Sequence, residues 1–246
     1  MEISFLSDIG KIRSTNQDYT KIFYNQEKCA LVLLADGMGG HKAGDVASKM
    51  TVEILGLKWE QTAFTTSENI SQWFISEIQA LNENVYEKGL NEKFFGMGTT
   101  LEAVAIFSGT YTIAHVGDSR SYALRGADKI IQLTQDHSLV NDLLLAGEIT
   151  VEEAKKHPQK NIITRSIGMP NEVRIDVTTQ TFLPDDYLLL SSDGLTNMVS
   201  DEKILNVVMS AQTVEEKVAE LIALANKNGG KDNITVSLIH FEEEDI

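Results

Sequence analysis

Five aspartates stand beside turn residues at the ends of apolar, strand-like runs. Asp36 follows LVLLA, Asp118 follows YTIAHVG and Asp193 follows YLLLSS, while Asp18 and Asp232 precede such runs. Apolar strands bury their bodies and leave their ends at the rim of a sheet, where loops carry function. Carboxylates without a cluster of Cys or His beside them suit hard, oxygen-preferring cations such as Mg²⁺ or Mn²⁺. The pattern predicts a metal-dependent hydrolase.

Two plainer interpretations compete with the metal site. Asp-Gly is a strong turn dipeptide, so Asp36 and Asp193 could each serve a turn alone. Asp232, however, follows Gly229 and Gly230, which already supply a bend, and unrelated turns would not each need aspartate. The glycines at 37, 39, 40 and 44 could cradle a phosphate at the start of a helix. They match neither GxxxxGK[ST] nor GxGxxG, which argues against a nucleotide-binding enzyme.

Composition narrows the class of protein. With 246 residues, 42% of them hydrophobic, and three prolines, the chain fits one large domain with a sizeable core. A net charge of −15 without a basic stripe argues against a nucleic-acid partner. The single cysteine, Cys29, fits a reducing compartment. Neither a secretory signal nor a run long enough to span a membrane is visible. We expect a cytoplasmic monomer without direct membrane insertion.

Hydrophobic periodicity predicts a mixture of short strands and amphipathic helices. Helices are expected at 45–57, 67–89 and 214–226, with another from about 200; strands are expected at 2–7, 19–24, 30–35, 99–107, 111–117, 121–125, 130–133, 174–182, 187–191 and 234–240. Consecutive short strands favour antiparallel pairing. The expected class is α+β: two antiparallel β-sheets packed as a sandwich, flanked by helices on both outer faces (α-β-β-α).

Domain organisation follows from the same pattern. We expect a single domain over 1–241 and an acidic tail at 242–246. A flap subdomain is expected at about 138–172, with a helical pattern broken by Gly147. His115 alternates with Tyr111 and Ile113 and is expected to be packed, and Asp136 is expected to cap or anchor the flap.

Eight segments carry a resemblance to a known family: RSTNQD (13–18), ADGMGGHKAG (35–44), GMGTTL (96–101), HVGDSR (115–120), LTQDHS (133–138), NIITRSIG (161–168), SSDGLT (191–196) and GGKDNITV (229–236). In order and spacing they resemble the type-2C (PPM) metal-dependent serine/threonine protein phosphatases, most of all the compact bacterial branch. The motifs run from residue 13 to residue 236, so the resemblance covers essentially the whole chain.

The resemblance implies a metal centre built from the aspartates. It implies that Asp36 bridges two metal ions and that the Gly37 carbonyl binds one of them. Asp193 and Asp232 are implied as the remaining direct ligands of the second ion. Asp118 is implied to recruit, with Asp193, a weaker third ion. The implied ions are Mn²⁺ or Mg²⁺.

Three further roles are implied outside the direct ligands. Asp18 matches a position that holds metal-bound water, although many relatives have Glu-Asp where this chain has Gln17-Asp18. Arg13 matches the phosphate-binding arginine, and its guanidinium fork suits two phosphate oxygens. His41 matches the proposed general acid.

The implied function is hydrolysis of phosphoserine and phosphothreonine monoesters in proteins by direct attack of a metal-bridging water or hydroxide. The implied partners are phosphorylated proteins, a membrane-anchored Ser/Thr kinase and that kinase's substrates. The alternative is an inactive phosphoprotein-binding scaffold of the same fold. Loss of metal aspartates would favour the scaffold, and here all of them are present.

Overall fold

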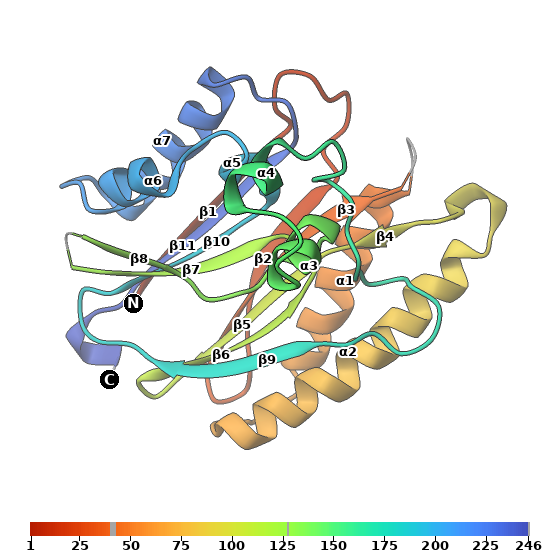
Figure 1. The fold of residues 1–246 in the computed structure, drawn as a ribbon. Coiled ribbons are helices and arrows are strands. Elements are labelled where there is room, and N and C mark those ends of the chain that lie inside the picture. Colours follow the sequence, from red (N-terminus) through yellow and green to blue (C-terminus); the bar gives the residue numbers. More distant parts are fainter. Residues whose placement is uncertain (40–42, 127, 246) are drawn as a thin grey trace.

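Two antiparallel sheets pack face to face in the computed structural model, which describes residues 1–39, 43–126 and 128–245 (Figure 1). The first sheet has the strand order β1 (Glu2–Asp8), β11 (Ile234–His240), β10 (Tyr187–Ser191), β7 (Arg120–Arg125), β8 (Lys129–Gln132). The second has the order β2 (Asp18–Tyr24), β3 (Ala30–Met38), β5 (Leu101–Phe107), β6 (Thr110–Val116), β9 (Asp176–Thr181), and β4 (Gly98–Thr99) also pairs with β3.

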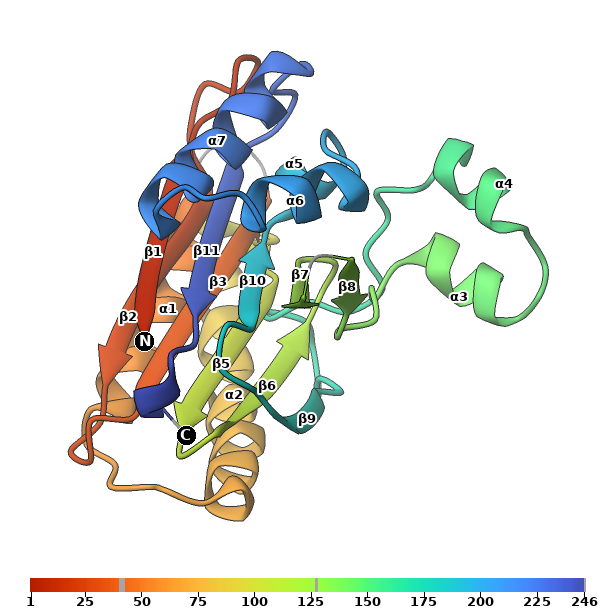
Figure 2. The same cartoon turned by 90° about the vertical axis from the view of Figure 1, so that its left-hand side faces the viewer.

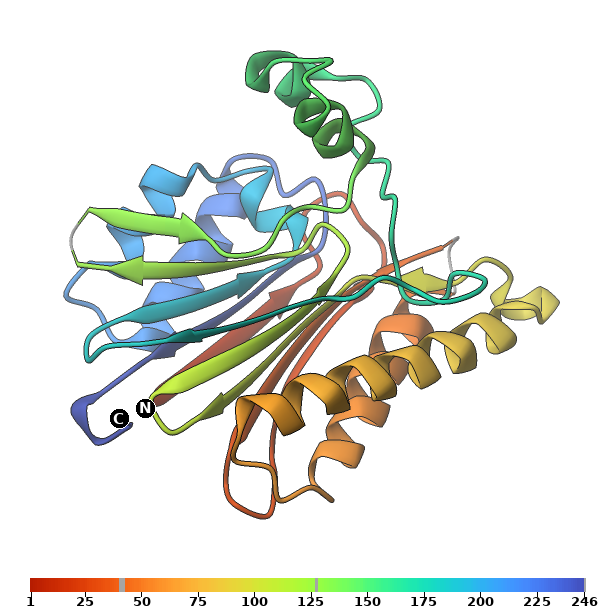
Figure 3. The same ribbon diagram turned by 60° about the horizontal axis from the view of Figure 1, so that its bottom comes forward.

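Helices cover the outer face of each sheet, as Figure 3 shows. The second sheet carries α1 (Gly44–Trp59) and α2 (Ser67–Gly89), followed by the short 3₁₀ turn η1 (Glu92–Phe94). The first sheet carries α5 (Asp193–Thr196), α6 (Asp201–Val208) and α7 (Val214–Lys227). The predicted α-β-β-α sandwich is therefore confirmed.

Strand β3 shows why a continuous apolar run forms a strand here. Leu31 and Leu33 pack into the core beneath α1 and α2, while Val32 and Leu34 pack into the core between the sheets. Successive side chains of a strand point to opposite faces, so a strand buried on both faces needs apolar residues throughout. The run ends at Asp36, where the strand reaches the rim of the sandwich.

The predicted flap segment projects away from the sandwich, as Figure 2 shows. It contains α3 (Leu139–Leu145), capped by the Ser138 side chain, and α4 (Val151–Lys156), which begins with a capping box at Thr150. Neither helix contains a buried residue. Gly147 lies between them with φ of +73°, so the expected break is present.

The structure differs from the sequence prediction at two places near the site. The strand expected at 99–107 is divided at Thr100 into β4 and β5. Asp193 follows a strand as predicted, but it is also the first residue of α5, a helix that periodicity did not predict. Four residues are too few for a helical repeat to show in the sequence.

The chain ends lie side by side (Figure 1). The Met1 amino group donates to Glu242 and lies 2.9 Å from an Asp245 carboxylate oxygen. The acidic tail forms the short turn η2 (Glu243–Asp245). No helix among residues 1–39, 43–126 and 128–245 is both long and apolar enough to cross a membrane.

Candidate metal centre

Asp18 and Asp36 are neighbours across the β2–β3 ladder. Ser192 and Thr235 reach Asp18 from the first sheet, and both hydroxyls donate to its Oδ2 at 2.7 Å. The Oδ1 of Asp18 is buried without a hydrogen-bond partner. A buried carboxylate oxygen without a partner is costly, so this atom favours a nearby donor or cation.

Asp193 and Asp232 are brought together by close packing of their two backbones. A Cβ added at Gly194 would lie 1.9 Å from the Asn233 carbonyl oxygen, so the start of α5 fits against β11 because residue 194 is glycine. Asp193 Oδ2 accepts from the Asn197 amide at 2.9 Å, while its Oδ1 is buried without a partner.

Gly37 allows the start of α1 to approach the end of β3. A Cβ at this position would lie 2.0 Å from the Gly44 carbonyl oxygen. The Gly37 N–H donates to the Gln17 carbonyl at 3.0 Å, which joins this turn to the segment before Asp18. The backbone around Asp36 is therefore fixed from two sides.

Asp118 lies in the turn between β6 and β7 and opens onto a groove of about 1110 Å³. Asp193 also lines this groove, whose walls come from the flap helices on one side and from α5 and α6 on the other. A polypeptide that placed a side chain against Asp118 and Asp193 could therefore extend along the flap.

Arg13 extends from the loop before β2 to this group of aspartates. Its guanidinium donates to Asp232 Oδ2 at 2.7 Å, and the side chain is half exposed. Asn233 holds the loop in place: its amide donates to the carbonyls of Ile9 and Thr15 and accepts from the N–H of Gln17. Sequence reasoning gave no role to Asn233 within the GGKDNITV segment, because a lone asparagine beside a turn carries no functional signal of its own.

Four of the aspartates, Asp18, Asp36, Asp118 and Asp193, have raised pKa values. Burial, followed by neighbouring carboxylates, raises the pKa of Asp193 to about 8 and that of Asp36 well above its ordinary value. Burial also raises the pKa of Asp18 and of Asp118 to about 6. Asp36, Asp118 and Asp193 are open to solvent on one side, yet protein atoms surround most of each carboxylate. The group has an excess of negative charge that a bound cation would neutralise.

The donor chemistry fits a hard divalent cation. All five aspartates offer oxygen, and one buried oxygen of Asp18 and one of Asp193 lack a hydrogen-bond partner. Among the described residues, however, no three Asp, Glu, His or Cys side chains already converge on one point that could hold an ion. Arg13 pairs with Asp232 Oδ2, so a cation bound at Asp232 would compete with this ion pair. His41 lies outside the residues that the structure describes.

The metal-free protein is expected to be more stable at about pH 7 than at about pH 8.5 in chelator, because its carboxylate pKa values are raised. The folded state holds protons on Asp193 that the unfolded state has released, so stability is lost as pH rises through about 8. Mn²⁺ should stabilise more at the higher pH. Thermal unfolding at both pH values checks this, and a melting temperature that rises with pH in chelator would contradict it. Asp193→Asn is the matched variant and should reduce the pH dependence.

Two further groups of polar residues lie close to Asp118. His115 is packed as expected, and its Nδ1 contacts the fully buried Glu102, which the sequence analysis did not single out. Asp136 forms a two-pronged ion pair with Arg120 at 2.8 and 2.7 Å, and its carbonyl accepts from the Asn141 side chain of α3. Asp136 thus anchors the base of the flap; the cap of α3 is Ser138.

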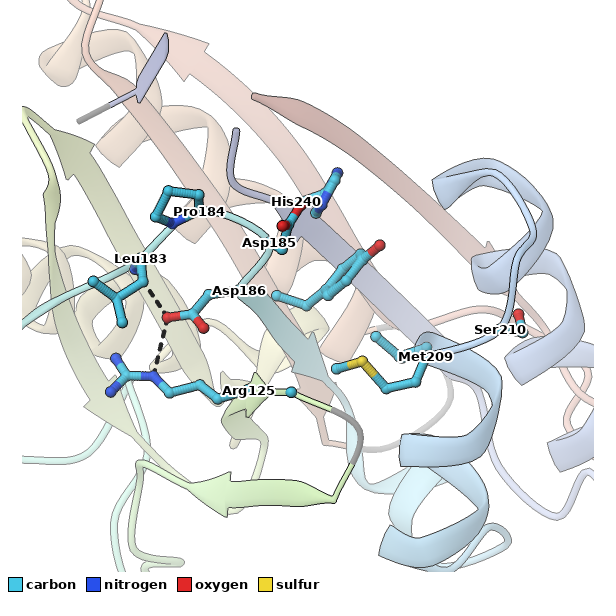
Figure 4. A pocket seen from close by; sticks show the side chains of 11 residues that line it. Arg125, Leu183, Pro184, Asp185, Asp186, Met209, Ser210 and His240 are labelled. Atoms are coloured by element: carbon cyan, nitrogen blue, oxygen red, sulfur yellow. Dashed lines mark hydrogen bonds and ion pairs between the residues drawn. The ribbon is translucent and has the colours of Figure 1, made fainter. Parts of the chain in front are cut away.

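A second cavity of about 610 Å³ lies at the other end of the first sheet, and its lining residues are shown in Figure 4. Arg125 and Asp186 form an ion pair at 3.0 Å within it, and the Tyr187 and His240 rings stack beside it. The site aspartates are absent from its lining. Because its charged groups pair with each other, we assign it no part in the chemistry.

Comparison with known proteins agrees with the geometry. The family model for protein phosphatase 2C matches residues 12–238. Protein phosphatase PhpP of Streptococcus pneumoniae is 47% identical over 100% of this chain and 99% of its own length. Serine/threonine phosphatase stp of Listeria innocua is 45% identical over 97% and 95%.

The solved structures agree as well. The serine/threonine phosphatase of S. agalactiae superposes with a TM-score of 0.96 at 49% identity, and the match covers 98% of this chain and 99% of that one. This chain therefore belongs to the protein phosphatase 2C family of metal-dependent protein phosphatases.

Proposed function

We propose that this chain dephosphorylates phosphoserine and phosphothreonine in proteins at a centre that holds two Mn²⁺ or Mg²⁺ ions. Asp36, the Gly37 carbonyl, Asp193 and Asp232 would hold the two ions, and Asp118 would help to hold a weaker third. When bound, divalent cations activate water and neutralise charge on the phosphoryl oxygens. The observation that carries the proposal is the group of aspartates with raised pKa values and two unpartnered oxygens.

Arg13 is proposed to bind the phosphoryl group of the substrate. Its guanidinium can donate to two phosphate oxygens at once. Because the side chain is half exposed, it can move from Asp232 to a phosphate without disturbing the hydrophobic core. Asn233 keeps the loop that carries Arg13 beside the aspartates. Asp18, held by Ser192 and Thr235, is proposed to orient water at the centre.

His41 is proposed as the general acid that protonates the leaving alkoxide. A serine or threonine alkoxide leaves poorly without a proton, and imidazole supplies one near neutral pH. This role rests on the position of His41 in the ADGMGGHKAG motif.

The biological setting is proposed from the resemblance to the compact bacterial branch. The chain would act in the cytoplasm as a monomer and would oppose a membrane-anchored Ser/Thr kinase by dephosphorylating the kinase and its substrates. The proposed domain comprises residues 1–241 with a flap at about 138–172, followed by the acidic tail 242–246.

The proposal is tested with a phosphothreonine peptide and a phosphoserine peptide. Phosphate release with Mn²⁺ and none in excess chelator is the expected result. A folded protein that binds these peptides and Mn²⁺ but releases no phosphate would instead support the scaffold alternative.

The flap is expected to select substrates. Val140 and Leu144 of the flap face the groove opposite Met198, and that groove reaches Asp118 and Asp193. Replacing 140–158 by a short Gly/Ser linker should lower kcat/KM for a phosphoprotein by about tenfold or more, because contacts along the groove are lost. Turnover of a small phosphate ester should change far less. Equal losses on both substrates would show that the flap supports the chemistry itself.

A further inference from the structure

Thr100 stands where the second sheet departs from a regular ladder. It separates β4 from β5 and lies opposite Asp36. The Asp36 N–H donates to the Thr100 side-chain oxygen at 2.9 Å, and the Thr100 N–H donates to the Asp36 carbonyl at 2.9 Å. A threonine hydroxyl thus replaces a backbone carbonyl as the partner of the aspartate at the centre of the proposed site.

The same side chain contacts both neighbours of Asp118. Its Oγ1 lies 2.7 Å from the Ser119 hydroxyl, and this pair is fully buried. On the other side, a Cβ at Gly117 would lie 2.6 Å from Thr100 Cβ and 2.6 Å from its Cγ2, and Gly117 has φ of +120°. The turn that presents Asp118 is therefore packed on Thr100 through Gly117 and hydrogen-bonded to it through Ser119.

Threonine meets both requirements of this position. Its oxygen accepts from the Asp36 N–H and pairs with Ser119, and its methyl group packs against Gly117. Valine would keep the shape and leave the N–H of Asp36 without its partner, whereas serine would keep the hydroxyl and lose the methyl contact.

We propose that Thr100 is a positioning residue that sets the spacing between the Asp36 and Asp118 turns, and thereby the divalent-cation affinity of the centre. It touches no substrate; it acts through the backbone of the two aspartates. Groups that orient metal ligands commonly contribute a factor of about 10 to 100 to metal affinity. This inference rests on the proposed metal centre and adds a residue that determines its affinity.

The test compares matched threonine variants by calorimetric titration with Mn²⁺. Thr112 is the control, because it is also fully buried in the second sheet and its hydroxyl lies 2.8 Å from that of Thr179, in the β6–β9 pair. Thr100→Val should weaken Mn²⁺ binding by about 10- to 100-fold, whereas Thr112→Val should bind Mn²⁺ as the wild type does. Thr100→Ser should recover most of the affinity.

Two results would overturn the inference: wild-type Mn²⁺ affinity in Thr100→Val, or an equal loss in Thr112→Val. If Thr100→Val does not fold, Ser119→Ala removes one contact while keeping the bond to Asp36, and unchanged Mn²⁺ affinity there would also overturn it. The titration needs no turnover. If the wild-type protein binds Mn²⁺ but releases no phosphate, the proposed function is contradicted. The proposed effect of Thr100 on Mn²⁺ affinity is not affected by that result.

Discussion

Replacing Asp36 by asparagine is expected to reduce metal-dependent phosphate release by about a thousandfold or more, since each 1.4 kcal/mol of lost transition-state stabilisation costs tenfold and cations supply several kcal/mol. Asparagine offers one neutral carbonyl oxygen in place of a charged carboxylate, and its NH2 group does not bind hard cations. The fold should survive, because the backbone of Asp36 makes the contacts with Thr100.

Rates of phosphate release and Mn²⁺ titrations of the Asp36→Asn variant check this expectation. In chelator the variant should melt no lower than the wild type, because the replaced carboxylate is repelled by its neighbours. Asp185→Asn, at a carboxylate that is 93% exposed, is the matched control and should behave as the wild type. Wild-type rates of phosphate release by the Asp36→Asn variant would show that Asp36 is not part of the metal centre.

Replacing Glu102 by alanine is expected to lower the free energy of unfolding by about 3–5 kcal/mol, the usual cost of breaking a buried ion pair. Glu102 is fully buried on β5, where one oxygen contacts His115 and the other accepts from the Ser121 hydroxyl at 2.6 Å. Burial lowers the pKa of His115, but the charge and hydrogen bond of Glu102, together with the Gln135 carbonyl and the charge of Asp136, leave that pKa raised. Alanine would leave His115 buried without this partner and Ser121 without its acceptor.

Thermal unfolding measures the effect, which should be roughly 10 °C for a chain of this size. Glu102→Gln keeps the volume and an acceptor for Ser121, so it should cost less than alanine. Glu83→Ala, on the exposed face of α2, is the control and should leave the melting temperature nearly unchanged. A Glu102→Ala variant with the same melting temperature as the wild type would show that the Glu102–His115 pair does not stabilise the fold.

The sandwich could be predicted because its strands and helices carry strong periodic signals. Helix α2 repeats apolar residues at three- and four-residue spacing and was predicted at its observed bounds, 67–89. The break at Thr100 could not be predicted, because it arises from side-chain bonds to Asp36 across the sheet rather than from the local sequence. The α5 helix could not be predicted for a related reason, because its four residues are fixed by packing against β11.

The site could be predicted in part because aspartates recur at the ends of the predicted strands. Five separate aspartates at strand ends are more than turns require, and neighbouring carboxylates raise the pKa of Asp36 and Asp193 in the folded protein. The roles of three supporting residues could not be read from the sequence. Glu102 sits within the apolar run LEAVAIF. Thr100 and Asn233 lie in two of the segments that carry the family resemblance, but they act through backbone groups of segments distant in the chain.

Phosphate release from a phosphothreonine peptide, by the wild type and by Asp193→Ala, with Mn²⁺ and with excess chelator, tests the metal-centred account most directly. The pKa of Asp193 is raised, and one of its carboxylate oxygens is buried without a hydrogen-bond partner. Replacing Asp193 should therefore disable the proposed metal centre. The account predicts turnover by the wild type with Mn²⁺ and negligible turnover in the other three conditions. Activity that survives both the chelator and the substitution would contradict it.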